Sequence, residues 1–498
     1  MPRRGFTASN SNSSNDGLAV NRPIIRLYGL VAVLFALLVA FTSRWTIFEA
    51  ASLRENKLNA RALLEQERVD RGPIVAADGT VLARSVRGGE GTYTRSYPKG
   101  SQFANAVGYD YIDPGASGLE QYRNAALNGK GATNLQAILN QLQGSEPQGD
   151  KVITTLEPAA QRVANEQLAG KHGAVVALEP RTGAVTVMAS SPSFNPNALR
   201  SSRGYEQVAT NSGDPLVNRA VQDGYAPGST FKLVTATAAI DTGAFTPEST
   251  LSGRNGIIVS GVPLDNDENE SFGEITLTQA LAKSVNTVYA QVAEKLGKRT
   301  LARYMSRFGF DRKPQLDYPA EEMSASGEYE NGRLLSPTSP NVDVGRLGIG
   351  QDKLEVTALQ MAEVAAAIAN GGRLMAPHLT ARIVDSEGSI VERISPRVQA
   401  VVMKRATAKA VTTMMEAVVN EGTGTPAQIP GVQVAGKTGT AETQIGNELN
   451  NVWFVAFAPA SNPRVVVAAT LKGVPGYGAA FAAPVAKAVM ESLLRLAP

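Results

Sequence analysis

The sequence predicts an α+β fold in which an antiparallel sheet is flanked by helices and carries an inserted all-helical lobe. Strand-like runs lie within residues 174–189 and again within residues 453–471, and a helix closes the chain. Helical patterns dominate the residues between these two runs. At 498 residues the chain is too long for one ordinary domain, so we expect two or three domains.

An apolar segment near the N-terminus is expected to cross a membrane. Residues 27–43 carry no charge, and no small-x-small cleavage site follows them, so an uncleaved anchor fits better than a signal peptide. Arginines precede this segment, which places a polar, disordered tail of residues 1–26 in the cytoplasm. We therefore expect a single-pass protein of the cytoplasmic membrane whose chain beyond Arg44 lies outside the cytoplasm.

A smaller module is expected over residues 44–150, ahead of a main domain over residues 151–498. The module begins with a polar helical stretch, residues 53–68. Residues 71–83 contain an Asp-Gly pair between two apolar runs, which predicts two short strands joined by a tight turn. A segment rich in Gly, Pro and polar residues, 144–150, marks the boundary.

Periodicity places the main elements of the second domain. Helices are predicted over residues 158–168, 231–242, 276–295, 356–369 and 484–496, and strands over 174–178, 184–189, 453–457 and 465–471.

Composition excludes several kinds of chemistry. The chain has no cysteine, which excludes thiol catalysis, Cys-ligated zinc and disulfides. It has two histidines, His172 and His378, and neither has a neighbourhood that suggests catalysis. A net charge of +3 without clustered Lys and Arg argues against nucleic-acid binding.

Ser229 is the best candidate nucleophile. A serine needs a base within hydrogen-bond reach, and a lysine can replace histidine if burial or a nearby cation lowers its pKa. Lys232 lies three residues further on, so both side chains share one face of a helix. A second Ser-x-x-Lys, Ser96–Lys99, contains Pro98 and has no apolar helix after it, so we discount it.

Two later motifs can complete a site. In Ser284-Val285-Asn286, which interrupts a helical pattern, the hydroxyl can relay a proton and the amide can bind a substrate carbonyl. Lys437-Thr438-Gly439-Thr440 is expected on a strand, where Gly439 lets a substrate backbone approach closely and Lys437 attracts a carboxylate. Lys437 would also lower the pKa of Lys232. Taken singly, each motif is explained as well by a helix cap, a surface serine or a solvated lysine.

In this order, Ser-x-x-Lys, Ser-x-Asn and Lys-Thr-Gly resemble the motif set of penicillin-binding proteins and serine β-lactamases. Residues 71–83 and 115–120 resemble the N-terminal module of class B penicillin-binding proteins, and residues 218–220 and 348–351 resemble landmarks of their transpeptidase domain. The resemblance covers residues 60–495 and is closest to the actinobacterial PbpA type. It implies a penicillin-binding/serine β-lactamase-like transpeptidase domain behind a non-catalytic pedestal or dimerisation module.

The resemblance implies a peptidoglycan D,D-transpeptidase of cell-wall synthesis. Ser229 would attack the D-Ala-D-Ala end of a stem peptide, release D-Ala and pass the acyl group to an amine of a neighbouring stem, and β-lactams would acylate the same serine. Lys232 would be the base, and Ser284 and Asn286 would relay protons and orient the substrate. Lys437 and Thr438 would hold the substrate carboxylate, Gly439, Thr440 and Trp453 would complete the binding site, and the N–H groups of Ser229 and Thr440 would form the oxyanion hole. No cofactor and no metal are implied.

The resemblance also implies partners and leaves alternatives open. The N-terminal module is too short for a glycosyltransferase, so we expect a separate glycan polymerase of the SEDS type (RodA/FtsW-like). Asn451-Val452 precede Trp453 where the family often has a histidine, and residues 442–451 form a short loop, so one cleft wall should differ. A D,D-carboxypeptidase, a β-lactamase-like hydrolase and a non-catalytic β-lactam sensor or scaffold are the alternatives. The sequence leaves open a role in division or elongation.

Overall fold

The computed structural model describes residues 17–44, 68–129, 148–442 and 449–496. The chain divides into two units, residues 1–67 and residues 68–498. Several predicted segments lie outside the described residues: positions 53–67 of the polar helix predicted over residues 53–68, most of the 144–150 linker, residues 443–448 of the short loop and residues 1–16 of the predicted tail.

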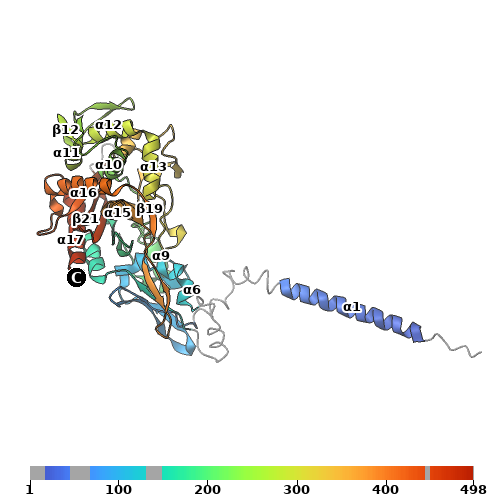
Figure 1. Cartoon of the computed structure of the whole chain (residues 1–498). Helices are drawn as coiled ribbons and strands as arrows, with labels where there is room; N and C mark the ends of the chain where they lie inside the picture. Colours follow the sequence, from blue (N-terminus) through green and yellow to red (C-terminus); the bar gives the residue numbers. More distant parts are fainter. Residues whose placement is uncertain (1–16, 45–67, 130–147, 443–448, 497–498) are drawn as a thin grey trace, which may run out of the picture. The chain divides into compact units, whose positions relative to one another are not determined.

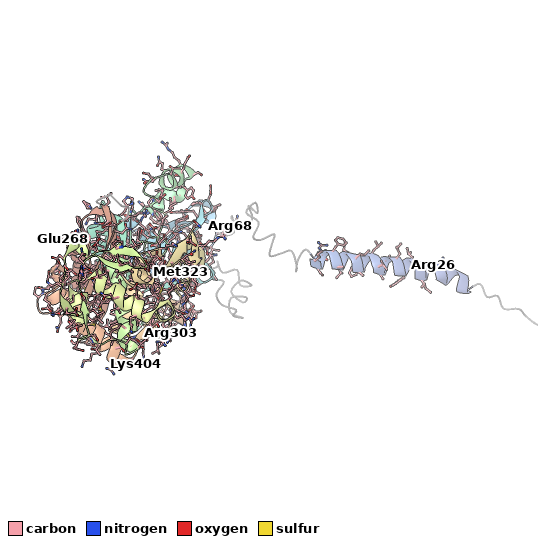
Figure 2. All side chains as sticks on the ribbon, turned by 90° about the horizontal axis from the view of Figure 1, so that it is seen from above. Arg26, Arg68, Glu268, Arg303, Met323 and Lys404 are labelled. Atoms are coloured by element: carbon pink, nitrogen blue, oxygen red, sulfur yellow. The ribbon has the colours of Figure 1, made fainter. Side chains whose placement is uncertain are left out.

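The first unit contains helix α1, Gly17–Ser43 (Figure 1). Its stretch Ile24–Ser43 is long and apolar enough to cross a membrane, and none of it is buried. The side chains from Ile24 onward, including the labelled Arg26, project outward from the helix (Figure 2). The helix begins ten residues before the expected start of the anchor at Leu27, because helical hydrogen bonding continues through polar residues that need no burial.

The second unit begins with a six-stranded sheet in the order β18-β17-β6-β1-β2-β3. As predicted from the Asp-Gly pair, β1 and β2 pair in antiparallel fashion, and Gly79 takes a φ of +87° in the turn between them. The hairpin of β17 and β18 comes from beyond residue 150 and joins β6, so this sheet draws on both predicted domains (Figure 1). The domain limits remain a prediction. The strands are β1 Ile74–Val75, β2 Val81–Arg87, β3 Tyr93–Ser96, β6 Lys151–Thr154, β17 Thr380–Val384 and β18 Ile390–Arg393.

A buried ion cluster holds this N-terminal region together. Glu120 is fully buried in α5 (Gly118–Tyr122) and accepts hydrogen bonds from Arg71 Nε at 2.8 Å and Arg95 Nε at 2.6 Å. Burial by itself would raise the pKa of Glu120, but the two arginines outweigh it and hold the pKa below its ordinary value. The carboxylate therefore stays charged and pairs with both guanidinium groups. The smaller elements of this region are η2 Gly89–Gly91, η3 Gly100–Phe103, α4 Ala104–Val107, β4 Asp110–Tyr111, β5 Gly115–Ala116 and α6 Asn124–Leu127.

The main sheet has five antiparallel strands in the order β20-β21-β22-β7-β8. Residues alternate between its faces: on β21, Val455 and Phe457 pack into one core cluster, whereas Phe454 and Ala456 pack into the other. Helices α8 and α17 contribute to the second cluster, and the helical lobe contributes to the first. The predicted α+β class is confirmed. The elements are α8 Pro158–Leu168, β7 His172–Leu178, β8 Val185–Ser191, β20 Ala435–Glu442, β21 Leu449–Ala458, β22 Val465–Pro475 and α17 Gly478–Leu496.

Two predicted helices differ from the structure. The stretch over residues 276–295 is two helices, and the break falls at the predicted interruption, where Ser284 takes a φ of +61°. The closing helix begins at Gly478 rather than Pro484, because its apolar face is buried against β21 and β22, which offsets the hydrogen bond that the proline removes. The lobe helices are α10 Lys232–Asp241, α11 Leu277–Ala282, α12 Asn286–Leu296, α13 Lys298–Phe308, α14 Val344–Gly348, α15 Ala358–Ala369 and α16 Arg405–Asn420.

Short strands and turns complete the described chain. They are η4 Pro196–Arg200, α9 Ser202–Ala209, β9 Thr250–Ser252, β10 Ile257–Val259, β11 Val262–Leu264, η6 Asp267–Asn269, β12 Glu274–Thr276, η7 Ala320–Glu322, β13 Gly327–Glu330, β14 Arg333–Leu335, β15 Leu354–Glu355, β16 Arg373–Met375, β19 Val398–Val401 and η8 Thr425–Ala427.

Candidate active site

Ser229 lies in a short 3-10 turn, η5 (Gly228–Phe231), that leads directly into α10. Gly228 takes a φ of +50°, and a Cβ at this position would lie 2.3 Å from the carbonyl oxygen of Thr440. Its N–H donates to Gly350 O at 2.9 Å. Glycine therefore lets the turn pack against β20 and keeps Ser229 half-buried beside that strand.

Lys232 begins α10, and its ammonium group points at the second motif. It is fully buried, and Nζ donates to Ser284 O at 2.6 Å and to Asn286 Oδ1 at 2.8 Å. Burial, with a further contribution from Lys437, lowers the pKa of Lys232 well below its ordinary value. A neutral amine has two N–H donors and one lone pair, so these two bonds leave the lone pair free to accept a proton. Among the described residues, no hydrogen bond joins Lys232 to Ser229; catalytic hydrogen bonds often tighten only with substrate.

Ser284 lies between the two lysines of the site. It occupies the break between α11 and α12, where its positive φ is a strained conformation for a residue with a side chain. Its Oγ accepts a hydrogen bond from Lys437 Nζ at 2.9 Å and lies 3.4 Å from Lys232 Nζ. This arrangement connects both amines through one hydroxyl, as a proton relay requires.

Lys437 and its neighbours lie on β20, as predicted. Lys437 is fully buried, and burial lowers its pKa to about 7, although the nearby carboxylate of Asp267 acts in the opposite direction. Thr438 Oγ1 lies 2.6 Å from Thr423 Oγ1. At Gly439 a Cβ would lie 2.6 Å from Pro227 O, so a side chain there would push the strand away from the turn that carries Ser229.

Thr440 and Trp453 hold the surroundings of the site in place. Thr440 Oγ1 accepts a hydrogen bond from the N–H of Gly478 at 3.2 Å. Trp453 is fully buried, and its Nε1 donates to Ala226 O at 2.9 Å, which fixes the backbone just before Ser229. The structure thus gives Trp453 a supporting position, and direct contact with substrate stays a prediction.

The structure places the discounted residues elsewhere. Ser96 ends β3 in the N-terminal sheet, and Lys99 is exposed beyond it. His172 begins β7 and is exposed, whereas His378 is buried and bonds through its backbone N–H to Gly183 O.

Sequence reasoning missed two supports of the site. Thr423 contacts Thr438 although it precedes β20 in a Gly-Thr-Gly segment without regular structure. Asp265 is the second support, because its backbone oxygen accepts a hydrogen bond from Asn286 Nδ2 at 3.2 Å. Neither position stands out by residue type or spacing, so only the fold reveals them.

These features agree with the comparisons to known families. Residues 173–491 match the family described as penicillin binding protein transpeptidase domain, and residues 71–152 match the penicillin binding protein A dimerisation domain. The chain belongs to the penicillin-binding protein transpeptidase family.

Relatives match along nearly the whole chain. The peptidoglycan D,D-transpeptidase PbpA of Mycolicibacterium smegmatis is 33% identical over 96% of this chain and 99% of its own length. PbpA of Mycobacterium tuberculosis is 32% identical over 96% of this chain and 100% of its own length. The expected likeness to the actinobacterial PbpA type is confirmed.

Solved structures extend the likeness to three dimensions. Penicillin-binding protein A of M. tuberculosis as a penicillin G acyl-enzyme complex is 31% identical and covers 85% of this chain and 99% of that chain, with a TM-score of 0.76. Its imipenem acyl-enzyme complex gives a TM-score of 0.77 at 31% identity, covering 86% of this chain and 100% of that chain. A D,D-transpeptidase domain from Eggerthella lenta has a TM-score of 0.75 at 32% identity. The match covers 86% of this chain and 99% of that chain.

Proposed function

We propose that this chain is a peptidoglycan D,D-transpeptidase that cross-links stem peptides through an acyl-enzyme on Ser229. The observation that carries the proposal is the convergence of three motifs: Lys232, Ser284, Asn286 and Lys437 are joined by hydrogen bonds of 2.6–2.9 Å next to the turn that carries Ser229. Relatives named D,D-transpeptidases, and acyl-enzyme complexes of a relative with β-lactams, support the same chemistry.

Acylation would begin with proton transfer from Ser229 Oγ to the neutral amine of Lys232. The serine oxygen attacks the carbonyl carbon of the penultimate D-Ala, and the N–H groups of Ser229 and Thr440 stabilise the oxyanion. As the peptide bond breaks, the leaving amine takes the proton back through Ser284, and D-Ala departs. The lowered pKa of Lys232 supports its role as the base, because it favours the neutral amine.

Transfer would reverse these steps with a second peptide. The acceptor amine attacks the ester carbonyl, loses a proton to Lys232, and forms the new peptide bond as Ser229 Oγ is reprotonated. Lys437 and Thr438 hold the carboxylate of the donor before it leaves. A carboxylate beside Lys437 would raise the pKa of this lysine, so the amine takes up a proton from solvent and is charged when substrate binds.

The anchor and partner belong to the same proposal. Helix α1 is suited to a single-pass anchor, and the arginines before residue 27 favour a cytoplasmic N-terminus with the second unit outside. A SEDS-type glycan polymerase would supply the glycan strands that this enzyme cross-links, because the described residues 68–129 and 148–152 form a small module of short strands, short helices and a buried ion cluster.

Product analysis tests the proposal against hydrolysis. Full-length protein in detergent is mixed with a pentapeptide stem donor and a separate labelled amine acceptor, and products are identified by mass. We expect the cross-linked product from the unmodified protein and none from Ser229→Ala. Release of D-Ala with only the water-derived tetrapeptide would support a carboxypeptidase instead.

A further inference from the structure

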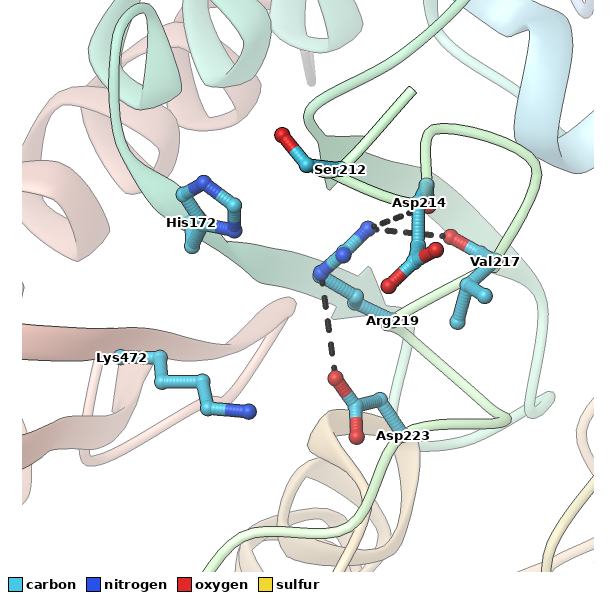
Figure 3. A pocket seen from close by; sticks show the side chains of 7 residues that line it. All are labelled: His172, Ser212, Asp214, Val217, Arg219, Asp223 and Lys472. Atoms are coloured by element: carbon cyan, nitrogen blue, oxygen red, sulfur yellow. Dashed lines mark hydrogen bonds and ion pairs between the residues drawn. The ribbon is translucent and has the colours of Figure 1, made fainter. Parts of the chain in front are cut away.

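A polar cavity lies on the same domain as Ser229. Its volume is about 430 Å³, and its polar lining comes from His172, Ser212, Asp214, Arg219, Asp223 and Lys472 (Figure 3). His172 begins β7 and Lys472 lies on β22, and these two residues pair in the sheet. The other lining residues belong to the chain segment that precedes Ser229, so the cavity lies between the main sheet and that segment.

Arg219 lies at the centre of the cavity and has unused binding capacity. Its Nη1 and Nη2 donate to backbone oxygens of Asp214 at 3.1 Å and Gly213 at 2.7 Å, which fixes the surrounding loop (Figure 3). Its side chain is 5% exposed, and Nε forms an ion pair with Asp223 Oδ2 at 3.8 Å but donates no hydrogen bond among the described residues. That carboxylate already accepts a hydrogen bond from Tyr225 Oη at 2.6 Å. A buried N–H donor without a partner favours an incoming acceptor.

The remaining charged groups are also free to bind. Lys472 is exposed, and its Nζ lies 5.6 Å from the ring centroid of Tyr225. Among the described residues, neither Lys472 nor the Asp214 side chain forms a salt bridge or hydrogen bond. The cavity therefore offers an ammonium and a guanidinium N–H to an anion, and a carboxylate to N–H donors. The C-terminus of a peptide presents this combination, a carboxylate next to amide N–H groups.

The register of the sheet sets the distance to the site. Thr440, Val452, Leu471 and Gly173 form one row across four strands, and Lys472 follows Leu471. Two strand spacings separate Thr440 from Leu471, roughly 10 Å. Trp453 contacts the Tyr225 ring edge-on, and Lys472 lies over the same ring, so these side chains connect the cavity to the region beside Ser229.

The position of this cavity does not suit the donor peptide. In the proposed mechanism the terminal carboxylate of the donor is held by Lys437 and Thr438, and it leaves with D-Ala before transfer. Moreover, β20 is an edge strand, so a donor can pair along its free edge, whereas the cavity lies on the opposite side of β20, toward β22 and β7. A second peptide is required.

We propose that this cavity, the Arg219 pocket, binds the C-terminal carboxylate of the acceptor stem peptide while its side-chain amine attacks the acyl-enzyme. The inference rests on the proposed transpeptidase function. Two extended residues span roughly 7 Å, and the side chain that carries the amine adds roughly 5 Å. An acceptor whose amine is at Ser229 can therefore place the carboxylate of its fifth residue in the pocket. The enzyme would thus prefer acceptors that keep the full pentapeptide.

The test compares two acceptors that differ only at the C-terminus. Full-length protein in detergent receives a small thioester donor and a labelled pentapeptide stem with a side-chain amine at position three, either as the free acid or as the C-terminal amide. We expect the unmodified protein to use the acid with roughly tenfold higher kcat/KM, because the amide cannot form the charge-assisted hydrogen bonds. Lys472→Ala should lose this preference, while its rate of penicillin labelling stays unchanged.

Controls separate the outcomes. Lys409 is an exposed lysine on α16 outside the pocket, and Lys409→Ala should keep the full preference for the acid. Equal use of both acceptors by the unmodified protein, or a preference retained in Lys472→Ala, would overturn the pocket assignment while leaving transpeptidation intact. A protein that is labelled by penicillin but transfers to neither acceptor would refute the proposed function itself, and the inference with it.

Discussion

Replacing Lys437 with methionine removes a buried cation while keeping most of the side-chain volume. Lys437 is fully buried, and burial lowers its pKa to about 7, whereas a lysine in the unfolded chain titrates near 10.4. Between these two values the unfolded chain binds more protons than the folded chain. Lys437 therefore destabilises the fold at and below pH 7, and this cost disappears as the pH rises toward 10.

The structure sets the size of the effect. The difference between the two pKa values corresponds to roughly 5 kcal/mol well below pH 7 and to roughly 4 kcal/mol at pH 7, where the folded-state amine is half-protonated. Methionine also loses the hydrogen bonds that Nζ donates to Ser284 Oγ and Thr438 O, about 1 kcal/mol each. The expected net gain in unfolding free energy at pH 7 is about 2 kcal/mol, which raises Tm by a few degrees. Transpeptidation should be lost, because no cation then holds the donor carboxylate.

Thermal unfolding of the unmodified protein and of Lys437→Met in detergent, at pH 7 and at pH 9.5, tests this prediction. The Lys437→Met variant should be more stable at pH 7, and the difference should shrink or reverse at pH 9.5. A variant that is less stable at pH 7, or a difference that does not depend on pH, would refute the reasoning that Lys437 is held at an energetic cost for its function.

Three further predictions concern the site and the N-terminal sheet. Gly228→Ala should abolish labelling by fluorescent penicillin, because the added Cβ would lie 2.3 Å from Thr440 O at a φ of +50°. The rate of acylation by penicillin should increase as the pH rises through the pKa of Lys232, which burial holds well below the ordinary lysine value, because only the neutral amine accepts the serine proton. Glu120→Gln removes the charge that two buried arginines share and should lower the unfolding free energy by about 3 kcal/mol in a denaturant titration.

Matched variants control these measurements. Gly243 also has a positive φ, +75°, but a Cβ there meets nothing within 4 Å, so Gly243→Ala should keep labelling. Glu166 pairs with Arg162 on the surface, and Glu166→Gln should change stability by less than about 1 kcal/mol. Normal labelling of Gly228→Ala, an acylation rate that does not rise with pH below the ordinary lysine pKa, or an unchanged stability of Glu120→Gln would each contradict the corresponding argument.

Local sequence patterns were sufficient to predict much of this fold. The helix over residues 158–168, the paired strands near residues 174–189 and the strand that carries Lys437 all follow from periodicity and turn residues, and the structure confirms them. The spacing of Ser229 and Lys232 also indicated a shared helical face, and both lie at the junction of η5 and α10. These features depend on neighbours within a few positions along the chain.

Other features depend on contacts between distant segments, which local patterns do not report. The hairpin β17–β18 joins the N-terminal sheet through β6, more than 200 residues earlier in the chain. The helix break at Ser284 needs a positive φ that residue type alone does not predict, and the structure shows Lys232 and Lys437 bonded at this break. The Arg219 pocket likewise forms only when β7 and β22 meet the loop before Ser229.

The central claim is that Ser229 is the nucleophile, and covalent labelling tests it most directly. Full-length protein is incubated with fluorescent penicillin, denatured and resolved on a gel, and the labelled peptide is identified by mass after digestion. The account predicts one stable label, on the peptide that contains Ser229, and no label in Ser229→Ala. A label that persists in the variant, or that maps to another residue, would contradict it.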